Sequence, residues 1–347
     1  MIYKVGIVGA GENARDHGRA CRNVEQAELV AICDISEAAL RRYGDEFGVP
    51  NRYPGLEEML ARESLDIVVV STWGVHHAEV SNAVARSGKV RAILVEKPIS
   101  ATAAECEEMI AVAREHGVLL AEGFKWRHTP QHLRLKEIID SGRIGQVMSV
   151  QSTLSSPIVR FVPAHNWRYN RQRGGGSVFD TAGYLIHFAR HVIGAEPRRV
   201  YAVGSFAELA DVEMSASILL QFPGEASAKL TSSYQYGYCQ ATEILGTRGW
   251  IRMDLPFDQR RVRGQEFVEK EDLHAGIQVF LDTFDTEVYQ FPPVNQFDLQ
   301  LYHLCECLDS NAAHRIPPEF SLGNMRVIDA VFESIRTGQP VDVPPVA

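Results

Sequence analysis

Three small residues near the start of the chain have the spacing of a phosphate-binding turn. Gly9, Gly11 and Ala14 follow the first apolar run directly and open a stretch with helical periodicity. The first glycine permits a tight turn, the second lets the backbone approach a pyrophosphate, and a small third residue lets the helix pack closely on the strand. Because the N–H groups of a helix N-terminus attract phosphates, Glu12 and Asn13 are further candidates for contact with a dinucleotide.

An acidic residue stands at the end of the second apolar run. Asp34 comes twenty residues after Ala14, where a carboxylate can accept hydrogen bonds from ribose hydroxyls. The same carboxylate would repel the 2′-phosphate of NADP, so the sequence favours NAD, while Arg41 and Arg42 leave NADP open. The alternative is that the glycines form a structural turn and that Asp34 caps a helix.

Polar residues follow two more apolar runs, at residues 66–70 and 92–95. The candidates for cofactor contact at these two places are Ser71, Thr72, Trp73, His77, Glu96 and Lys97. Open α/β sheets bind ligands at the carboxyl ends of their parallel strands, which is where both groups are expected. Because Lys97 directly precedes a proline at the carboxyl end of a strand, we do not expect it to be an ordinary solvated surface lysine.

The elements that must position these residues alternate along the first third of the chain. β-Branched apolar runs without period-2 alternation are typical of strands buried on both faces of a parallel sheet. The runs lie at residues 5–8, 29–33, 66–70, 92–95 and 118–121. Helical stretches lie between them at residues 14–24, 36–47, 77–87 and 102–116. This alternation predicts a doubly wound α/β domain over residues 1–122.

The remainder of the chain, residues 123–347, has a different pattern. Closely spaced β-rich runs between residues 199 and 268 lack intervening helices, which predicts an α+β domain with a large, mostly antiparallel sheet. Its helices are expected at residues 129–140, from 174–176 to 193, at 296–309 and at 321–336. Because Ile218, Leu220 and Phe222 are expected on a sheet face that no helix covers, we predict a homodimer or homotetramer formed through this sheet.

Several motifs occur together in an order that is specific to one family. They are Glu96-Lys97-Pro98, Asn166-Trp167-Arg168, the glycines at 174–176, Asp180, and residues 142–145 and 246–249. With these motifs the chain resembles the glucose–fructose oxidoreductase / inositol dehydrogenase / rhizopine catabolism (Gfo/Idh/MocA) family over nearly its whole length. The resemblance implies a Rossmann domain that binds NAD(P) and an α+β domain that binds substrate. It also implies hydride transfer between the nicotinamide and a secondary hydroxyl of a sugar, inositol or related polyol.

The resemblance implies roles for particular residues as well. Lys97 matches the family's lysine beside the nicotinamide and the reacting hydroxyl, and Asp180 matches its carboxylate near the substrate. The resemblance thus implies that Lys97 is catalytic, because a lysine in that place can help to remove a proton while hydride leaves the same carbon. The family normally has a histidine four residues after that carboxylate, where this chain has Tyr184. Either Tyr184 transfers the proton, or His187, expected on the same helix face, reaches the site instead, or Tyr184 is a core aromatic residue. Trp167 and Arg168 are candidates for substrate contact through stacking and hydrogen bonding.

Two other functions fit the same scaffold. A redox-neutral enzyme would keep NAD tightly bound and oxidise its substrate transiently, to promote elimination or glycoside cleavage. A non-catalytic dinucleotide sensor would bind the nucleotide without turnover. Tyr184 is the one hint of a sensor, and the presence of both Lys97 and Asp180 counts against it.

Composition excludes other classes of function. The 347 residues include 35 Lys and Arg against 44 Asp and Glu, and this net charge of −9 argues against nucleic acid or an anionic membrane as the main partner. The six cysteines are scattered, and no His, Cys or Asp cluster has metal-ligand spacing, so no metal is expected. With no signal peptide or membrane-length apolar run, we expect a cytoplasmic protein with a small-molecule substrate.

Overall fold

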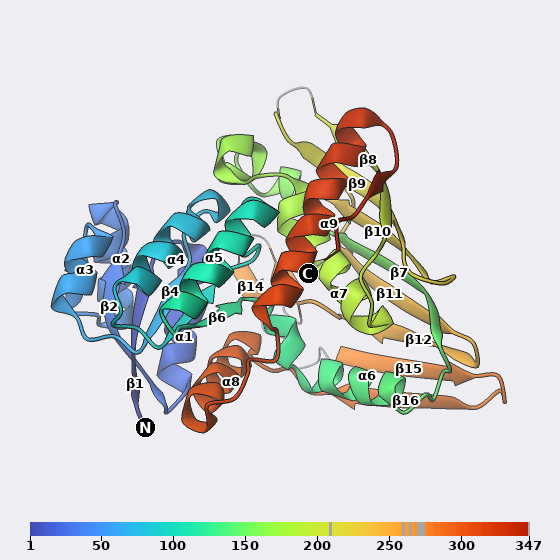
Figure 1. The fold of residues 1–347 in the computed structure, drawn as a ribbon, viewed down its shortest axis with the longest axis horizontal. Coiled ribbons are helices and arrows are strands. Elements are labelled where there is room, and N and C mark those ends of the chain that lie inside the picture. The colour runs from blue at the N-terminus through green and yellow to red at the C-terminus, as the bar shows by residue number, and fades with distance from the viewer. Residues whose placement is uncertain (208–209, 259–260, 264–265, 269–274, 346–347) are drawn as a thin grey trace. The chain divides into compact units, whose positions relative to one another are not determined.

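The chain forms two compact units in the computed structural model, which describes residues 1–207, 210–258, 261–263, 266–268 and 275–345 (Figure 1). The first unit contains Met1–His128 and Asn295–Met325. The second contains Thr129–Val294 and Arg326–Ala347. Over the described ranges, no helix combines the length and the apolar character needed to cross a membrane.

The first unit is built on a six-stranded parallel sheet with the order β3-β2-β1-β4-β5-β6. Its strands are β1 (Tyr3–Val8), β2 (Ala27–Cys33), β3 (Asn51–Tyr53), β4 (Ile67–Val70), β5 (Ala92–Val95) and β6 (Leu119–Glu122). The connecting helices are α1 (Glu12–Asn23), α2 (Glu37–Phe47), α3 (Leu56–Arg62), α4 (His77–Arg86) and α5 (Ala103–Glu115). The predicted doubly wound domain is confirmed. The sequence did not indicate β3 and α3, which are too short to show a clear period.

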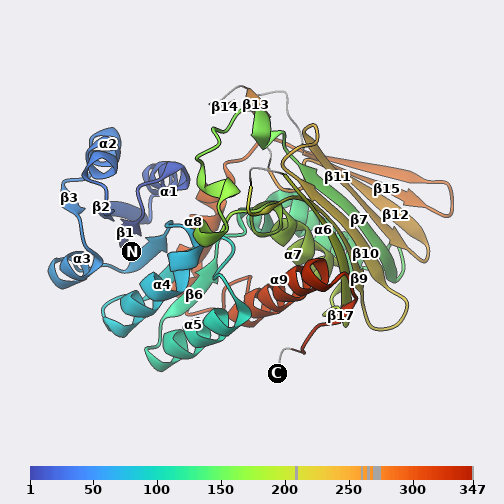
Figure 2. The ribbon, with the colours of Figure 1, turned by 90° about the horizontal axis from the view of Figure 1, so that it is seen from above.

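Helices cover both faces of this sheet (Figure 2). One face packs on α1, α2 and α8 (Gln296–Ser310), and α4 and α5 lie together on the other. Strands β4 and β5 are buried along their whole length, as expected for strands with helices on both sides.

Helix α8 comes late in the chain but belongs to the core of the first unit. It packs on α1, and its apolar side chains Phe297, Leu301 and Leu304 join the same buried cluster as β1. The hydroxyl of Tyr3 in β1 also donates to the Asp309 carboxylate at 2.5 Å. We predicted one boundary, at residue 122, but the first unit extends to His128 and also contains Asn295–Met325. The reason is that the short 3₁₀ helix η2 (Lys125–His128) packs against α8.

The second unit is built on a nine-stranded sheet with the order β16-β15-β12-β11-β7-β10-β9-β8-β17. Its strands are β7 (Val147–Ser155), β8 (Arg199–Phe206), β9 (Glu213–Gln221), β10 (Ser227–Ser233), β11 (Cys239–Gly246), β12 (Gly249–Asp254), β15 (Ala275–Leu281), β16 (Thr286–Phe291) and β17 (Val341–Asp342). All neighbours are antiparallel except β7 and β10, which confirms the predicted mostly antiparallel sheet. Strands β13 (Arg261–Arg263) and β14 (Glu266–Val268) form a separate pair.

Helices gather on one face of the large sheet (Figure 1). Helices α6 (Pro130–Asp140) and α7 (Gly183–Ile193) pack on its strands, and α9 (Pro318–Thr337) runs from the first unit into the second. The prediction that Ile218, Leu220 and Phe222 lie on the uncovered face is wrong, because all three are at most 3% exposed. Side chains alternate along β9, so Leu219 is exposed instead.

The contribution of α8 to the first unit can be tested by shortening one side chain. Leu304 is fully buried in the core, so Leu304→Ala should lower the free energy of unfolding by about 2–5 kcal/mol. Tyr302 on the same helix is 44% exposed, so Tyr302→Ala should cost less than about 1 kcal/mol. Equal losses in a urea titration of the two variants would show that α8 does not complete this core.

Candidate active site

The glycine turn lies at the carboxyl edge of the parallel sheet, between β1 and α1. Gly9 has a φ of +96°, a conformation that side chains other than glycine's rarely adopt. A Cβ at this position would also lie 2.6 Å from the carbonyl oxygen of Ser71 at the end of the adjacent strand β4. Glycine is therefore required here for the two strand ends to approach each other.

The N-terminus of α1 has the properties of a phosphate site. Gly11 is its N-cap residue, no side chain caps the helix, and a Cβ at Gly11 would meet nothing within 4 Å. Glu12 and Asn13 in the first turn are exposed, whereas Ala14 is fully buried against the core. The open space beside uncapped N–H groups fits the pyrophosphate of a dinucleotide.

The carboxylate of Asp34 holds the glycine turn in place. Oδ2 accepts a hydrogen bond from the backbone N–H of Ala10 at 2.7 Å, and Oδ1 accepts one from Ser36, also at 2.7 Å. Asp34 thus has a structural role, but not the helix-capping role that we weighed, because the N-cap residue of α2 is Ser36. This structural role does not exclude ribose binding, because each carboxylate oxygen can accept more than one hydrogen bond.

The loop after β4 carries Ser71, Thr72 and Trp73, and Trp73 is exposed.

His77 begins α4 and is buried. Its Nδ1 atom lies 2.8 Å from the carbonyl oxygen of Pro98, and its Nε2 atom lies 3.2 Å from the carbonyl oxygen of Thr72. Burial lowers the pKa of His77, so the ring is neutral and donates to one carbonyl at a time. His77 thus connects the loops that follow β4 and β5.

Lys97 follows β5 and is half-buried, and the peptide bond that joins it to Pro98 is cis. The preceding residue, Glu96, is buried, and its Oε1 lies 2.8 Å from Nε2 of His17 in α1. Its Oε2 accepts a hydrogen bond from the backbone N–H of Lys97 at 3.3 Å. Glu96 therefore connects the backbone of Lys97 to the helix that carries the phosphate site.

Burial alone would raise the pKa of Glu96. The hydrogen bond from His17 and the charges of His17, Lys97 and Lys125 outweigh it and hold the pKa below its ordinary value. Glu96 is therefore an ionised carboxylate at neutral pH, surrounded by cationic groups. The negative charge of Glu96 attracts the positive charge of Lys97. Because Glu96 carries no proton near neutral pH, it cannot act as a general acid there.

The second unit holds the other group of candidate residues, around Asp180. The side chain of Asp180 is 11% exposed and lies in a π-helical turn, Val178–Ala182, that opens α7. Its Oδ2 accepts hydrogen bonds from Nε of Arg168 at 2.9 Å and from the hydroxyl of Tyr234 at 3.1 Å. The Arg168 guanidinium also lies over the ring of Trp167, 4.7 Å from its centroid. Asp180, Arg168 and Trp167 thus form one group.

Tyr234 is fully buried, and its hydroxyl lies 2.9 Å from the carbonyl oxygen of Gly176 as well as near Asp180. Burial, and then the charge of Asp180, raises the pKa of Tyr234 well above its ordinary value, so the hydroxyl remains a donor. Tyr234 could not be singled out from sequence patterns, because it lies more than fifty positions from Asp180.

Tyr184 and His187 lie in different surroundings on α7. Tyr184 is half-buried, and its ring meets that of Phe257 edge-on at 6.0 Å. His187 is fully buried. The expectation that all three share a helix face stays a prediction, and full burial makes His187 less accessible than Tyr184.

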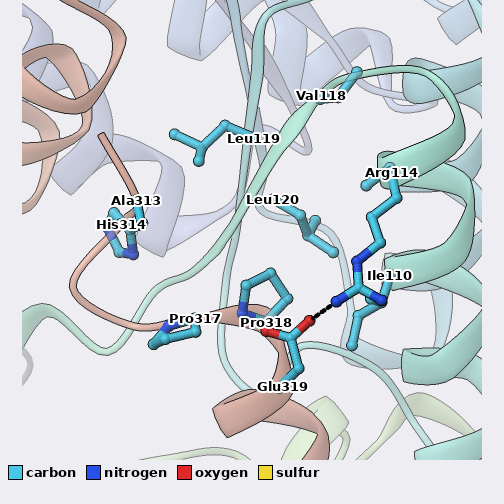
Figure 3. Close-up of a pocket in the computed structure, with 11 residues that line it drawn as sticks. Ile110, Arg114, Val118, Leu119, Leu120, Ala313, His314, Pro317, Pro318 and Glu319 are labelled. Atoms are coloured by element: carbon cyan, nitrogen blue, oxygen red, sulfur yellow. Dashed lines mark hydrogen bonds and ion pairs between the residues drawn. The ribbon is translucent and has the colours of Figure 1, made fainter. Parts of the chain in front are cut away.

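A cavity of about 260 Å³ lies in the first unit and contains none of these candidates (Figure 3). It is lined by α5, β6 and the loop that leads into α9, and an ion pair between Arg114 and Glu319 lies on its wall. Its lining is mostly apolar and includes Leu119, Leu120 and Pro318. The carboxyl edge of the sheet, not this cavity, holds the residues suited to dinucleotide chemistry.

Two family models match the chain in succession. Residues 3–124 match an oxidoreductase family with an NAD-binding Rossmann fold, and residues 132–252 match the GFO/IDH/MocA C-terminal domain. Together they cover both units and most of the chain, and they confirm the resemblance drawn from the motifs.

Characterised relatives extend over nearly the whole length. A D-xylose 1-dehydrogenase (NADP⁺) from Haloferax volcanii is 29% identical over 91% of this chain and 92% of its own. An aldose–aldose oxidoreductase from Caulobacter crescentus, solved with glycerol, has a TM-score of 0.87 at 27% identity, with 99% of this chain and 100% of that one covered. A 3-ketoreductase from Actinomadura kijaniata, solved with NADP and TDP-benzene, has a TM-score of 0.83 at 27% identity, with 96% and 98% covered.

The matched models, the glycine turn and the two-unit architecture agree with one another. The prediction of an NAD(P)-dependent dehydrogenase is confirmed at the level of the family, and the individual residue roles remain predictions. The chain belongs to the Gfo/Idh/MocA family of NAD(P)-binding oxidoreductases.

Proposed function

We propose that the protein transfers hydride between the nicotinamide of NAD(P) and a secondary hydroxyl of a sugar, inositol or related polyol. The observation that carries this proposal is the arrangement around Lys97. The buried carboxylate of Glu96 accepts a hydrogen bond from the backbone N–H of Lys97. It also contacts His17 of α1, the helix whose N-terminus is open for phosphates. The names of the relatives, which include a xylose dehydrogenase and a ketosugar reductase, support the substrate class.

The residues of the first unit would hold the dinucleotide. The N-terminus of α1 binds the pyrophosphate, Asp34 accepts hydrogen bonds from the ribose, and the loop of Ser71, Thr72 and Trp73 lines the nicotinamide end. When bound, the nicotinamide accepts or gives the hydride. The amine of Lys97 accepts the hydroxyl proton in oxidation and returns it in reduction.

The residues of the second unit would bind and orient the substrate. Arg168 and Tyr234 hold Oδ2 of Asp180 in place. The orientation of the carboxylate is therefore fixed, and we propose that its other oxygen accepts a hydrogen bond from a substrate hydroxyl. Tyr184 is the half-buried residue of α7 that takes the place of the family's histidine, and we assign it, together with Lys97, to the transfer of the one hydroxyl proton. Full burial makes His187 the weaker candidate.

We propose NAD as the preferred cofactor. A 2′-phosphate would approach the Asp34 carboxylate, and the next side chain, Ile35, is apolar and almost fully exposed. Arg41 is paired with Glu37 at 3.4 Å, so a phosphate would compete with that carboxylate for it. The relatives named as NADP enzymes make NADP a real competitor, which a binding measurement can settle.

The cofactor site can be tested with two glycines that differ in role. Gly11 and Gly55 are both N-cap residues with an extended backbone and open space around them. Gly11→Val should weaken NAD binding at least about tenfold, because the side chain would occupy the pyrophosphate's place, whereas Gly55→Val should not. Isothermal titration of wild type should also give tighter binding of NAD than of NADP. Equal affinities for the two variants would remove α1 from the site, and tighter NADP binding would overturn the cofactor preference.

The catalytic assignment predicts unequal losses from conservative changes. Lys97→Met should lower kcat about 1000-fold and Tyr184→Phe about 100-fold, because each removes a proton-transfer group without changing the side chain's bulk greatly. Lys4→Met and Tyr302→Phe change exposed residues of the same types and should leave kcat unchanged. The readout is nicotinamide absorbance with a panel of inositols, aldoses and sugar acids. A Lys97→Met enzyme as active as wild type would refute the role of the lysine.

We further propose that the uncovered face of the nine-stranded sheet joins two or more copies of the chain. Tyr201 and Leu219 are cross-strand partners on that face, and Val203 lies beside them, with exposures of 40%, 45% and 55%. Exposed apolar groups of this kind are typical of interfaces. Light scattering of the wild-type protein should give a molar mass two or four times that of the chain. The Leu219→Lys substitution should lower this mass toward that of the monomer. A monomeric wild type at micromolar concentration would contradict the proposal.

A further inference from the structure

Three histidines from two distant segments of the chain converge in the first unit. His128 ends η2, His303 lies on α8, and His314 lies in the loop between α8 and α9. One ring nitrogen from each lies within 4.8 Å of the other two, and the ring centroids are 4.9–5.3 Å apart. None of the three belongs to the candidate cofactor or substrate residues.

The cluster contains polar atoms that the fold does not satisfy. His128 and His314 are buried, and the Nε2 atom of each has no hydrogen-bond partner among the described residues. Nε2 of His303 accepts from the backbone N–H of Arg315 at 3.0 Å and lies 3.5 Å from Sγ of Cys307, one turn further along α8. Unpartnered buried nitrogens cost free energy, and two of them facing one cluster call for an explanation.

We propose that His128, His303 and His314 form a binding site for one divalent transition-metal ion of the zinc class. Imidazole nitrogen is the ligand that such ions favour, and three protein ligands leave a fourth position for water or for the Cys307 thiolate. The ion would fasten η2, α8 and the loop before α9 to one another. It would be a structural site, separate from the hydride-transfer chemistry.

Arg315 controls access to this site. Its Nη1 lies 2.7 Å from Nδ1 of His128, and among the described residues no carboxylate pairs with its guanidinium. Because arginine only donates, this contact places the proton of a neutral His128 on Nε2. An ion must therefore displace the half-buried Arg315 side chain toward solvent before His128 can bind it. Arg315 supplies the positive charge that an ion would otherwise bring.

The rings are also electrically prepared for an ion. Burial, together with the charge of Arg315, lowers the pKa of all three histidines, and for His314 to about 3. The rings are therefore neutral at physiological pH, and each has one lone pair. These lone pairs now accept from the Arg315 side chain and from the backbone N–H groups of Arg315 and Ile316, so an ion must replace those donors.

The site needs a modest closure to bind an ion. Tetrahedral coordination at Zn–N distances of 2.0–2.1 Å places ligand nitrogens about 3.3 Å apart, so the rings must rotate toward each other. His314 also lies on the wall of the cavity of about 260 Å³, which gives its ring and the loop room to move (Figure 3).

The test is a titration of the full chain, freed of metal with a chelator, with Zn²⁺ by calorimetry and with Co²⁺ by visible absorption. We expect one ion per chain and tetrahedral Co²⁺ bands, with a sulfur charge-transfer band only if Cys307 is the fourth ligand. Loss of even an outer partner of a metal ligand weakens binding by about 10- to 100-fold, so His303→Ala and His314→Ala should each cost at least about 100-fold. If His303→Ala unfolds, His303→Gln replaces it in this test. His116→Ala, which changes an exposed histidine, is the control.

The Arg315→Ala variant distinguishes a metal-binding site from a cluster of histidines that has only a structural role. Removal of the competing cation should tighten ion binding about tenfold, although it deletes a hydrogen bond. No saturable binding of one ion, unchanged binding in both histidine variants, or weaker binding in Arg315→Ala would each overturn the proposal.

Discussion

The buried hydrogen bond between His17 and Glu96 is the interaction on which the candidate active site depends. It joins α1, whose N-terminus is open for phosphates, to the residue that directly precedes Lys97. Without His17, the buried carboxylate would lose its hydrogen-bond donor, which costs free energy and would raise its pKa. One contact thus fixes both the helix that would bind the pyrophosphate and the lysine that would act beside the nicotinamide.

The second unit follows the same physical principle with different residues. Asp180 is held by a cation on one side and by a buried hydroxyl on the other. Both donors converge on one carboxylate oxygen, so the orientation of the group is set before any substrate arrives. Sites prepared in this way lose little free energy to reorganisation during reaction. Buried polar partners thus hold the backbone of Lys97 and the carboxylate of Asp180 in place.

Local patterns in the sequence predicted the parts of this arrangement that depend on neighbours in the chain. The spacing of Gly9 and Gly11 was sufficient to predict the turn, because strand, turn and helix are consecutive. The hydrogen bond from the backbone of Ala10 to Asp34 was not predicted. His17, Tyr234 and the three clustered histidines could not be predicted, because only tertiary packing brings them to their partners. The prediction for Ile218, Leu220 and Phe222 failed because the more apolar face of β9 is the buried one. The exposed face carries Ser217, Leu219 and Gln221.

The central claim is net hydride transfer, and its stoichiometry tests that claim most directly. Wild-type protein would be incubated with NAD and the best substrate of the panel, and reduced nicotinamide and keto product would both be quantified by NMR. The account predicts one reduced nicotinamide released for each ketone formed. Substrate turnover without accumulation of reduced nicotinamide would contradict it and would favour a redox-neutral enzyme that keeps its cofactor bound.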